Sequence, residues 1–326
     1  MDPVDLQSLV EASDLKGLLA RIDRLAAADD WDTLVVLRDR CIEAVERGKQ
    51  LWAVAQFTEY RLALEAPADY AGEVVKEGAG RFALGPLWEV AAAGHSWDEL
   101  APYLDEPRWR AFAAHERAIR GDSVDSTSIE ADVVDVPLTL ADWEPKYPVA
   151  EYRPDRAAFP ERDLPEMQWV ELTATPERVQ EDDAAAALMD LAQVWIDESS
   201  GRGEARAVVG DARSAIRALG PSRVRLAEID LQAAMALMTW VGASGGAYGR
   251  RRGTPVGRSG AWWALQCVLG LDEDAGAEPA TLGIEAAGLN WFAWDPGDRV
   301  GGWNFHMAVE DPLDGLAWAV SAVDWK

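Results

Sequence analysis

Cysteine, histidine and lysine are scarce in this chain. Its 326 residues include two cysteines, Cys41 and Cys267, and three histidines. Each cysteine sits in an apolar, helix-like run, so we interpret both as buried thiols that pack as small hydrophobes. Because the sequence has no CxxC motif, no Cys/His cluster and no HxxxH pair, it predicts no metal site. It also predicts no cofactor.

Long apolar runs and net positive charge are absent too. Charges interrupt every apolar stretch before about 18 residues, which excludes a membrane-spanning helix, and the N-terminus lacks the pattern of a signal peptide. The formal net charge is −26, with 31 basic and 57 acidic residues. Such a chain repels nucleic acid and anionic membranes at long range. We therefore expect an acidic cytoplasmic protein that binds neither.

Apolar residues and tryptophan are plentiful. Hydrophobic residues make up 49% of the chain, and 16 are tryptophan. Tryptophan is costly to expose and its N–H needs a partner, so we place most of these rings in the core and a few on a binding surface. Arginine far outnumbers lysine and alanine is abundant. This composition is typical of a high-GC actinobacterium.

Residues 1–121 are expected to form consecutive helices. Leu18, Ile22 and Leu25 recur at helical spacing, and the chain continues in short apolar periods with short links. Ser96 and Glu99 have the spacing of a capping box at a helix start. The pattern favours an antiparallel helical array similar to HEAT repeats, and a compact bundle is the alternative.

The rest of the chain divides into two regions. Residues 122–174 carry many prolines and aromatics, which predicts an ordered, extended strap with an edge strand or two. Residues 175–326 predict helices near 183–197 and 226–241, another from Trp262 onward, and alternating strands near 289–293 and 303–307. The predicted fold class is therefore mainly α, with a C-terminal α+β part that contains a small antiparallel β-element.

The glycine- and arginine-rich segment 242–260 joins two apolar helices. Its charged and capping residues form a candidate anion-binding set: Arg250, Arg251, Arg252, Arg258 and Thr254. Thr254 followed by Pro255 has the form of a helix N-terminus, whose free N–H groups favour anions. The segment has neither P-loop spacing nor a preceding strand. Two alternatives stay open, namely a structural link whose arginines pair with the protein's own carboxylates, and a patch for an acidic partner.

Five further residues are candidates for lining a ligand site: Tyr248, Trp262, Trp294, Asp295 and His306. They combine aromatic rings with two groups able to move a proton, and a lone histidine is more often structural than catalytic. No serine lies in a GxSxG elbow. The sequence therefore names no catalytic residue and does not decide whether the protein is an enzyme.

Several segments carry a resemblance to a known family. They are Val136-Pro137-Leu138, Trp143-Glu144-Pro145, Tyr147-Pro148, Gly245–Gly253, Gly257-Arg258, Trp262-Trp263, Ala308–Pro312 and Gly315–Trp318. Through them the chain resembles an uncharacterised actinobacterial family of unknown function over about residues 130–325. The resemblance implies a bacterial cytoplasmic setting and no activity.

Three hypotheses of function follow, and the third is that the protein acts only within an oligomer or an operon-encoded complex. The first is a cytoplasmic binding or scaffold protein whose arginine-rich segment contacts an acidic protein partner, a second copy of the chain or a small anion. The second is an enzyme or sensor for a phosphorylated or carboxylated small molecule, with His306 or Asp295 moving the proton. A concave pocket shared by two of the arginines and His306 would favour the second. The sequence specifies no substrate, oligomeric state or partner.

Overall fold

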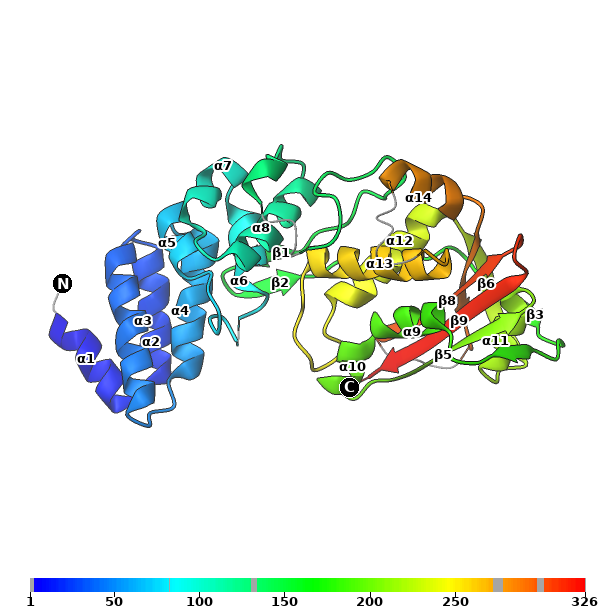
Figure 1. Ribbon diagram of the computed structural model, residues 1–326. Helices are drawn as coiled ribbons and strands as arrows, with labels where there is room; N and C mark the ends of the chain where they lie inside the picture. The colour runs from blue at the N-terminus through cyan, green and yellow to red at the C-terminus, as the bar shows by residue number, and fades with distance from the viewer. Residues whose placement is uncertain (1–2, 82, 130–133, 272–277, 298–301, 326) are drawn as a thin grey trace. The chain divides into compact units, whose positions relative to one another are not determined.

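The computed structural model describes residues 3–81, 83–129, 134–271, 278–297 and 302–325 (Figure 1). The chain forms two compact units. The first consists of Met1–Val133 with Ala150–Phe159, and the second of Val134–Val149 with Pro160–Lys326. The proline-rich region therefore contributes to both units, and the resemblance and the candidate residues belong to the second.

The first unit consists of helices packed in chain order and one short hairpin. Its elements are α1 (Pro3–Ala12), α2 (Leu15–Ala26), α3 (Trp31–Glu46), α4 (Trp52–Glu65), α5 (Ala68–Glu73), α6 (Leu87–Gly94), α7 (Trp97–Leu100), α8 (Pro107–Ile119), β1 (Glu151–Arg153) and β2 (Arg156–Ala158). Helix α3 packs on α2 and α4, α4 packs on α6, and α6 packs on α8. Asp14 and Asp30 cap α2 and α3 by accepting from Gly17 N and Thr33 N.

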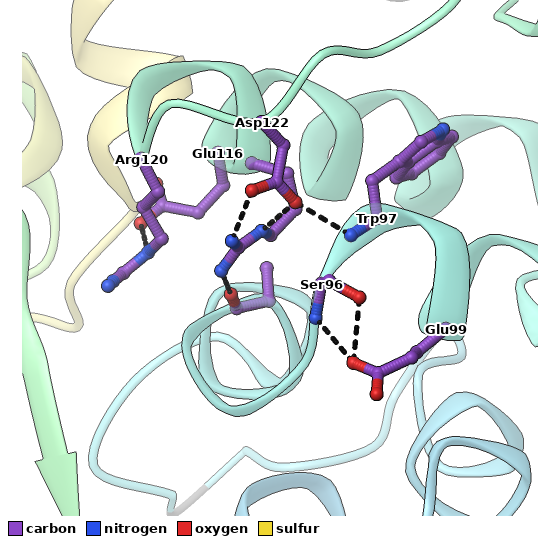
Figure 2. Close-up of polar contacts among 8 residues, drawn as sticks. Ser96, Trp97, Glu99, Glu116, Arg120 and Asp122 are labelled. Atoms are coloured by element: carbon purple, nitrogen blue, oxygen red, sulfur yellow. Dashed lines mark hydrogen bonds and ion pairs between the residues drawn. The ribbon is translucent and has the colours of Figure 1, made fainter.

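The predicted capping box at α7 is confirmed. The Ser96 backbone N–H donates to Glu99 Oε2 at 3.0 Å, as Figure 2 shows. Beside it, the Asp122 carboxylate accepts from Arg117 Nη2 at 2.6 Å and from the Trp97 N–H at 2.8 Å. One carboxylate thus joins the end of α8 to the start of α7, and the charged pair is an internal tie of the first unit.

The second unit is built on a seven-stranded antiparallel sheet. Its strand order is β3-β6-β7-β8-β9-β5-β4. The strands are β3 (Gln168–Glu171), β4 (Glu177–Val179), β5 (Arg202–Val209), β6 (Arg223–Ile229), β7 (Asn290–Asp295), β8 (Trp303–Asp311) and β9 (Leu316–Asp324). Strands β7, β8 and β9 form the centre, and β5 joins them by pairing Arg202 with Val323.

Helices cover both faces of this sheet. One face packs on α9 (Asp183–Asp190), α10 (Gln193–Asp197), α12 (Leu231–Ala243), α13 (Thr254–Val268) and α14 (Pro279–Ala286). The other face packs on α11 (Ala212–Ala218). Side chains on β8 alternate between the two cores, with Phe305 and Met307 in the larger one and Ala308 in the smaller.

The predicted fold class was wrong about the sheet. The second unit is not a helical region with a small β-element but a mixed α+β unit organised by seven strands. Residues 226–229 were predicted as the start of a helix, yet they end β6, and α12 begins at Leu231 after the cap Asp230. The strap supplies the edge strand β3, and β4 follows it closely. Period-two patterns this short become strands only when distant partners pair with them.

Candidate functional site

The segment between α12 and α13, residues 244–253, is the arginine loop. Hydrogen bonds at its start and in its middle tie it to the rest of the unit. The Ser244 hydroxyl accepts from Trp195 Nε1 at 2.9 Å, and the Ala247 N–H donates to Asp324 Oδ2 at 2.6 Å. The Tyr248 N–H donates to Ser199 Oγ at 3.0 Å. The loop is therefore a fixed feature beside α10 and the end of β9 (Figure 1).

Glycine allows the close helix crossing that carries this loop. A Cβ on Gly257 of α13 would lie 2.1 Å from the carbonyl oxygen of Thr239 in α12. At the loop itself, Gly246 has φ +74°, and a Cβ there would lie 2.3 Å from Asp324 Oδ2. Both positions require glycine. A side chain at Gly257 would clash where α12 and α13 cross at backbone distance, and a side chain at Gly246 would clash with Asp324.

Arg258 points into the core and pairs with Glu144. Arg258 Nε and Nη2 donate to the two Glu144 oxygens at 2.7 Å each, and Nη1 donates to Pro137 O at 2.7 Å. Both side chains are 0% exposed. Trp262 Nε1 at 3.0 Å and the Tyr147 hydroxyl at 2.8 Å also donate to Glu144. Arg258 and Trp262 thus belong to a closed internal network.

The charges of this network are mutually stabilised. Burial alone raises the pKa of Glu144, but the hydrogen bonds and charge of Arg258, with those from Ala141 N and Trp262, outweigh it and leave the pKa below its usual value. Burial and the Glu144 charge raise the pKa of Tyr147 well above its usual value. The pair is therefore ionised at neutral pH, while Tyr147 stays protonated.

The other arginines of the candidate set stay at the surface. Arg250 and Arg252 are exposed, and neither makes an ion pair within the part of the chain that the structure describes. Arg251 Nη2 donates to Thr254 Oγ1 at 3.1 Å. Thr254 is the first residue of α13 rather than its cap, a role that Gly253 takes at φ +98°. Arg252 N and Gly253 N both donate to Ala243 O, so these N–H groups point inward.

One exposed aromatic ring belongs to the arginine loop, and another follows the end of β9 that bonds to the loop. Tyr248 is 60% exposed and Trp325 is 42% exposed. The guanidinium carbon of Arg202 lies 4.8 Å from the centre of the Trp325 ring. Because Ala247 bonds to Asp324, the loop and the end of β9 are neighbours. We call the set Arg202, Tyr248, Arg250, Arg252 and Trp325 the arginine–aromatic surface.

His306 lies away from the arginine loop. His306 is 6% exposed, and its ring packs against Trp294 in a tilted arrangement, with ring centres 4.5 Å apart, on the sheet face that packs on α11. Burial lowers the pKa of His306 to about 4, opposed by the Asp295 charge, so the ring is neutral at pH 7. Asp295 pairs with Arg225 at 2.5 Å. Arg258 lies in the helices of the opposite face, so His306 and Arg258 do not meet.

Two cavities open on the second unit. One of about 730 Å³ lies among α9, β4 and the edge of β5, with Arg178, Glu204 and Arg206 in its walls. The other, of about 400 Å³, lies between α12 and the strap, with Lys146, Arg162 and Trp240 in its walls. Neither is lined by the arginine loop, Arg258 or His306.

Comparison with known proteins identifies the family. The model of DUF6183, a family of unknown function, matches residues 16–324. The chain belongs to this family. The match also includes the helical first unit, which precedes the residues that carry the sequence resemblance. No curated protein and no solved structure matches the chain. In the part of the chain that the structure describes, no helix has the length and apolar character to cross a membrane.

Sequence reasoning missed the groups that hold this DUF6183 region together. Glu144, Asp324 and Trp195 all bond to the segment around the arginine loop, yet none was a candidate. The sequence did contain a sign of the buried role of Glu144, since this acid lies between a tryptophan and a proline in an aromatic-rich strap. Asp324 had one too, because it continues the inward-facing alternation of β9.

Proposed function

We propose that this protein is a binding protein that docks a short acidic protein segment on the arginine–aromatic surface. The observation that carries the proposal is the exposure of Arg250 and Arg252 without a carboxylate partner in the described part of a chain with 57 acidic residues. Arg258, in contrast, is buried and pairs with the internal carboxylate of Glu144.

The composition and rigidity of the surface support docking. Tyrosine, tryptophan and arginine are the residues that dominate binding energy at protein interfaces. A loop already hydrogen-bonded to Trp195, Ser199 and Asp324 loses little further freedom when a partner binds. A partner therefore gains contact without first ordering the loop.

The overall charge of −26 does not prevent this binding. At physiological ionic strength, interactions between exposed charges fade beyond about 8 Å, so a partner senses mainly the local charges. Partial burial lowers the pKa of Arg252, and the charge of Glu198 opposes that shift through space, so Glu198 offsets part of the local positive charge. The acidic remainder repels long anionic partners, which favours a short acidic segment over nucleic acid.

A labelled glutamate-rich peptide tests the proposal by fluorescence anisotropy. The variant Arg250→Glu with Arg252→Glu should weaken binding by about tenfold or more, since two favourable contacts become repulsive. The matched control, Arg156→Glu with Arg213→Glu, makes the same change of net charge on exposed arginines elsewhere. Equal affinity in wild type and loop variant, or an equal loss in the control, would refute the proposal.

Inorganic phosphate separates the two kinds of anion. If millimolar phosphate displaces the peptide, and also binds the wild type but not the loop variant when no peptide is present, the surface is a small-anion site instead. The alternative of an enzyme or sensor that uses His306 or Asp295 receives no support from the geometry. His306 packs against Trp294, and Asp295 pairs with Arg225. The cytoplasmic location stays a prediction from composition.

A further inference from the structure

The smaller cavity of the second unit has one polar and one apolar side. It measures about 400 Å³, within the range of small-molecule sites, which is about 300–1,000 Å³. Its apolar side comes from the strap prolines and from one face of α12, namely Pro145, Pro148, Ala233, Ala236 and Leu237. Two alanines on that face leave the space open, because a larger side chain at either position would fill it.

Arg162 is held in the wall of this cavity by its neighbours. Its Nη1 donates to Asn304 O at 2.7 Å and to Asn304 Oδ1, and its guanidinium carbon lies 5.1 Å from the centre of the Trp240 ring. Trp240 is itself held, since Nε1 donates to Pro160 O at 2.9 Å and the ring stacks on Trp303. The guanidinium is therefore oriented before any ligand arrives.

The charge of Arg162 has no carboxylate at ion-pair distance in the described part of the chain. Its Nε and Nη2 donate to no described group either. Burial lowers the pKa of Arg162. The Asp295 carboxylate pairs with Arg225, and its charge reaches Arg162 only through space, where it acts in the opposite direction and raises the pKa of that guanidinium. A partly buried cation without a carboxylate partner is costly, and a bidentate carboxylate on its Nε–Nη2 edge would stabilise it.

The remaining charged groups of the cavity limit the ligand to one negative charge. Lys146 is exposed at the rim and, like Arg162, makes no ion pair among the described residues. Three acids also line the cavity: Glu161, Asp163 and Asp230. Asp230 is engaged as the cap of α12, where it accepts from Ala233 N at 2.7 Å. Three acids against two bases repel phosphates and dicarboxylates.

We infer that this cavity binds a small monocarboxylate with an apolar body, its carboxylate on Arg162 and its body against α12. The chemistry fits a simple organic acid and also the carboxyl group of an apolar amino acid, whose ammonium group would face Glu161 and Asp163. The site is separate from the arginine–aromatic surface, and it depends on neither Arg250 nor Arg252.

Isothermal titration calorimetry with 3-phenylpropanoate, hexanoate and benzoate tests the site. The neutral 3-phenylpropanamide should bind about tenfold or more weakly than 3-phenylpropanoate, because it lacks the charge that Arg162 pairs with. Arg162→Gln should cause a similar loss. Ala236→Leu should abolish binding by filling the cavity while leaving the guanidinium in place. The control is Arg213→Gln, at an exposed position of α11, and this variant should bind as the wild type does.

The outcomes separate the site from its alternatives. Failure of every carboxylate to bind the wild type at millimolar concentration would overturn the inference, and so would unchanged binding by folded Arg162→Gln or Ala236→Leu. If Arg162→Gln does not fold, carboxylate binding by Ala236→Leu and binding of 3-phenylpropanamide by the wild type still test the inference. Phenylalanine compared with 3-phenylpropanoate distinguishes the ligand source, since tighter binding of phenylalanine assigns the site to amino acids and tighter binding of 3-phenylpropanoate to simple acids.

Discussion

Replacing Arg258 with methionine should destabilise the second unit strongly. The substitution keeps most of the side-chain volume but removes the charge and two hydrogen bonds to Glu144. Both side chains of the pair are 0% exposed, so water does not replace the lost contacts. Breaking a buried ion pair by removing one partner costs about 3–5 kcal/mol.

The same reasoning sets the cost of changing Glu144. In Glu144→Gln, the amide keeps the shape and one accepting oxygen, but it removes the negative charge and places an NH₂ donor against the Arg258 guanidinium. We expect a loss of about 3–5 kcal/mol here too. The double variant Glu144→Gln with Arg258→Met removes both charges together. It should cost less than the sum of the single changes, by about 2 kcal/mol or more.

Urea unfolding of the full chain, followed by tryptophan fluorescence, measures these losses. For a unit of this size each kcal/mol shifts the melting temperature by about 2–4 °C, so a single variant should melt about 6–20 °C lower. Hydrogen exchange read by mass spectrometry should place the loss in α13 and residues 134–149. Wild-type stability in Arg258→Met, or strictly additive costs in the double variant, would refute the argument.

Acid should weaken the pair in the same way. The folded-state pKa of Glu144 lies below its unfolded value, so its stabilisation is present above the unfolded pKa of about 4.3 and is lost as the pH falls through the folded value. The Arg258→Met variant should lose less stability than the wild type over that pH range. A parallel loss in both proteins would contradict the ion-pair account.

Three further predictions concern the sheet, the helix crossing and the loop. His306 has a folded pKa of about 4, below its unfolded value, so stability should fall as the pH drops below about 6.5, by about 2 kcal/mol at pH 5. His306→Phe should remove that part of the slope in urea unfolding. Gly257→Ala should cost about 1–3 kcal/mol, because its Cβ would meet Thr239 O at 2.1 Å, and a melting point equal to wild type would contradict this. Arg251→Ala with Arg252→Ala should abolish any phosphate-dependent thermal shift without unfolding the chain, and a shift that persists would exclude an anion site there.

Local patterns predicted the helix starts better than the sheet. The capping box of Ser96 and Glu99 works within three residues, and it forms as expected. The sequence prediction missed strand β6. Its alternating pattern, in which Val224 and Leu226 face inward, is short and runs directly into an apolar helix. Only its pairing with β3 and β7 makes it a strand.

The candidate site shows the same division between near and distant contacts. The sequence located a helix link rich in glycine and arginine, and the structure has that link between α12 and α13. It did not separate Arg258 from Arg250 and Arg252, because all of them lie in one short segment. The separation depends on Glu144, which is 114 residues away in the chain.

By itself the sequence determined the acidic composition, the capping box of Ser96 and Glu99 and the position of the arginine-rich link, because these depend on composition or on contacts within a few residues. Tertiary structure alone decided which arginine of the link is buried and that His306 packs against Trp294 on the α11 face. It also decided that Arg162 lines a cavity without a carboxylate partner among the described residues. Each of these depends on side chains brought together from distant segments, and a charge gains or lacks a partner only when the chain has folded.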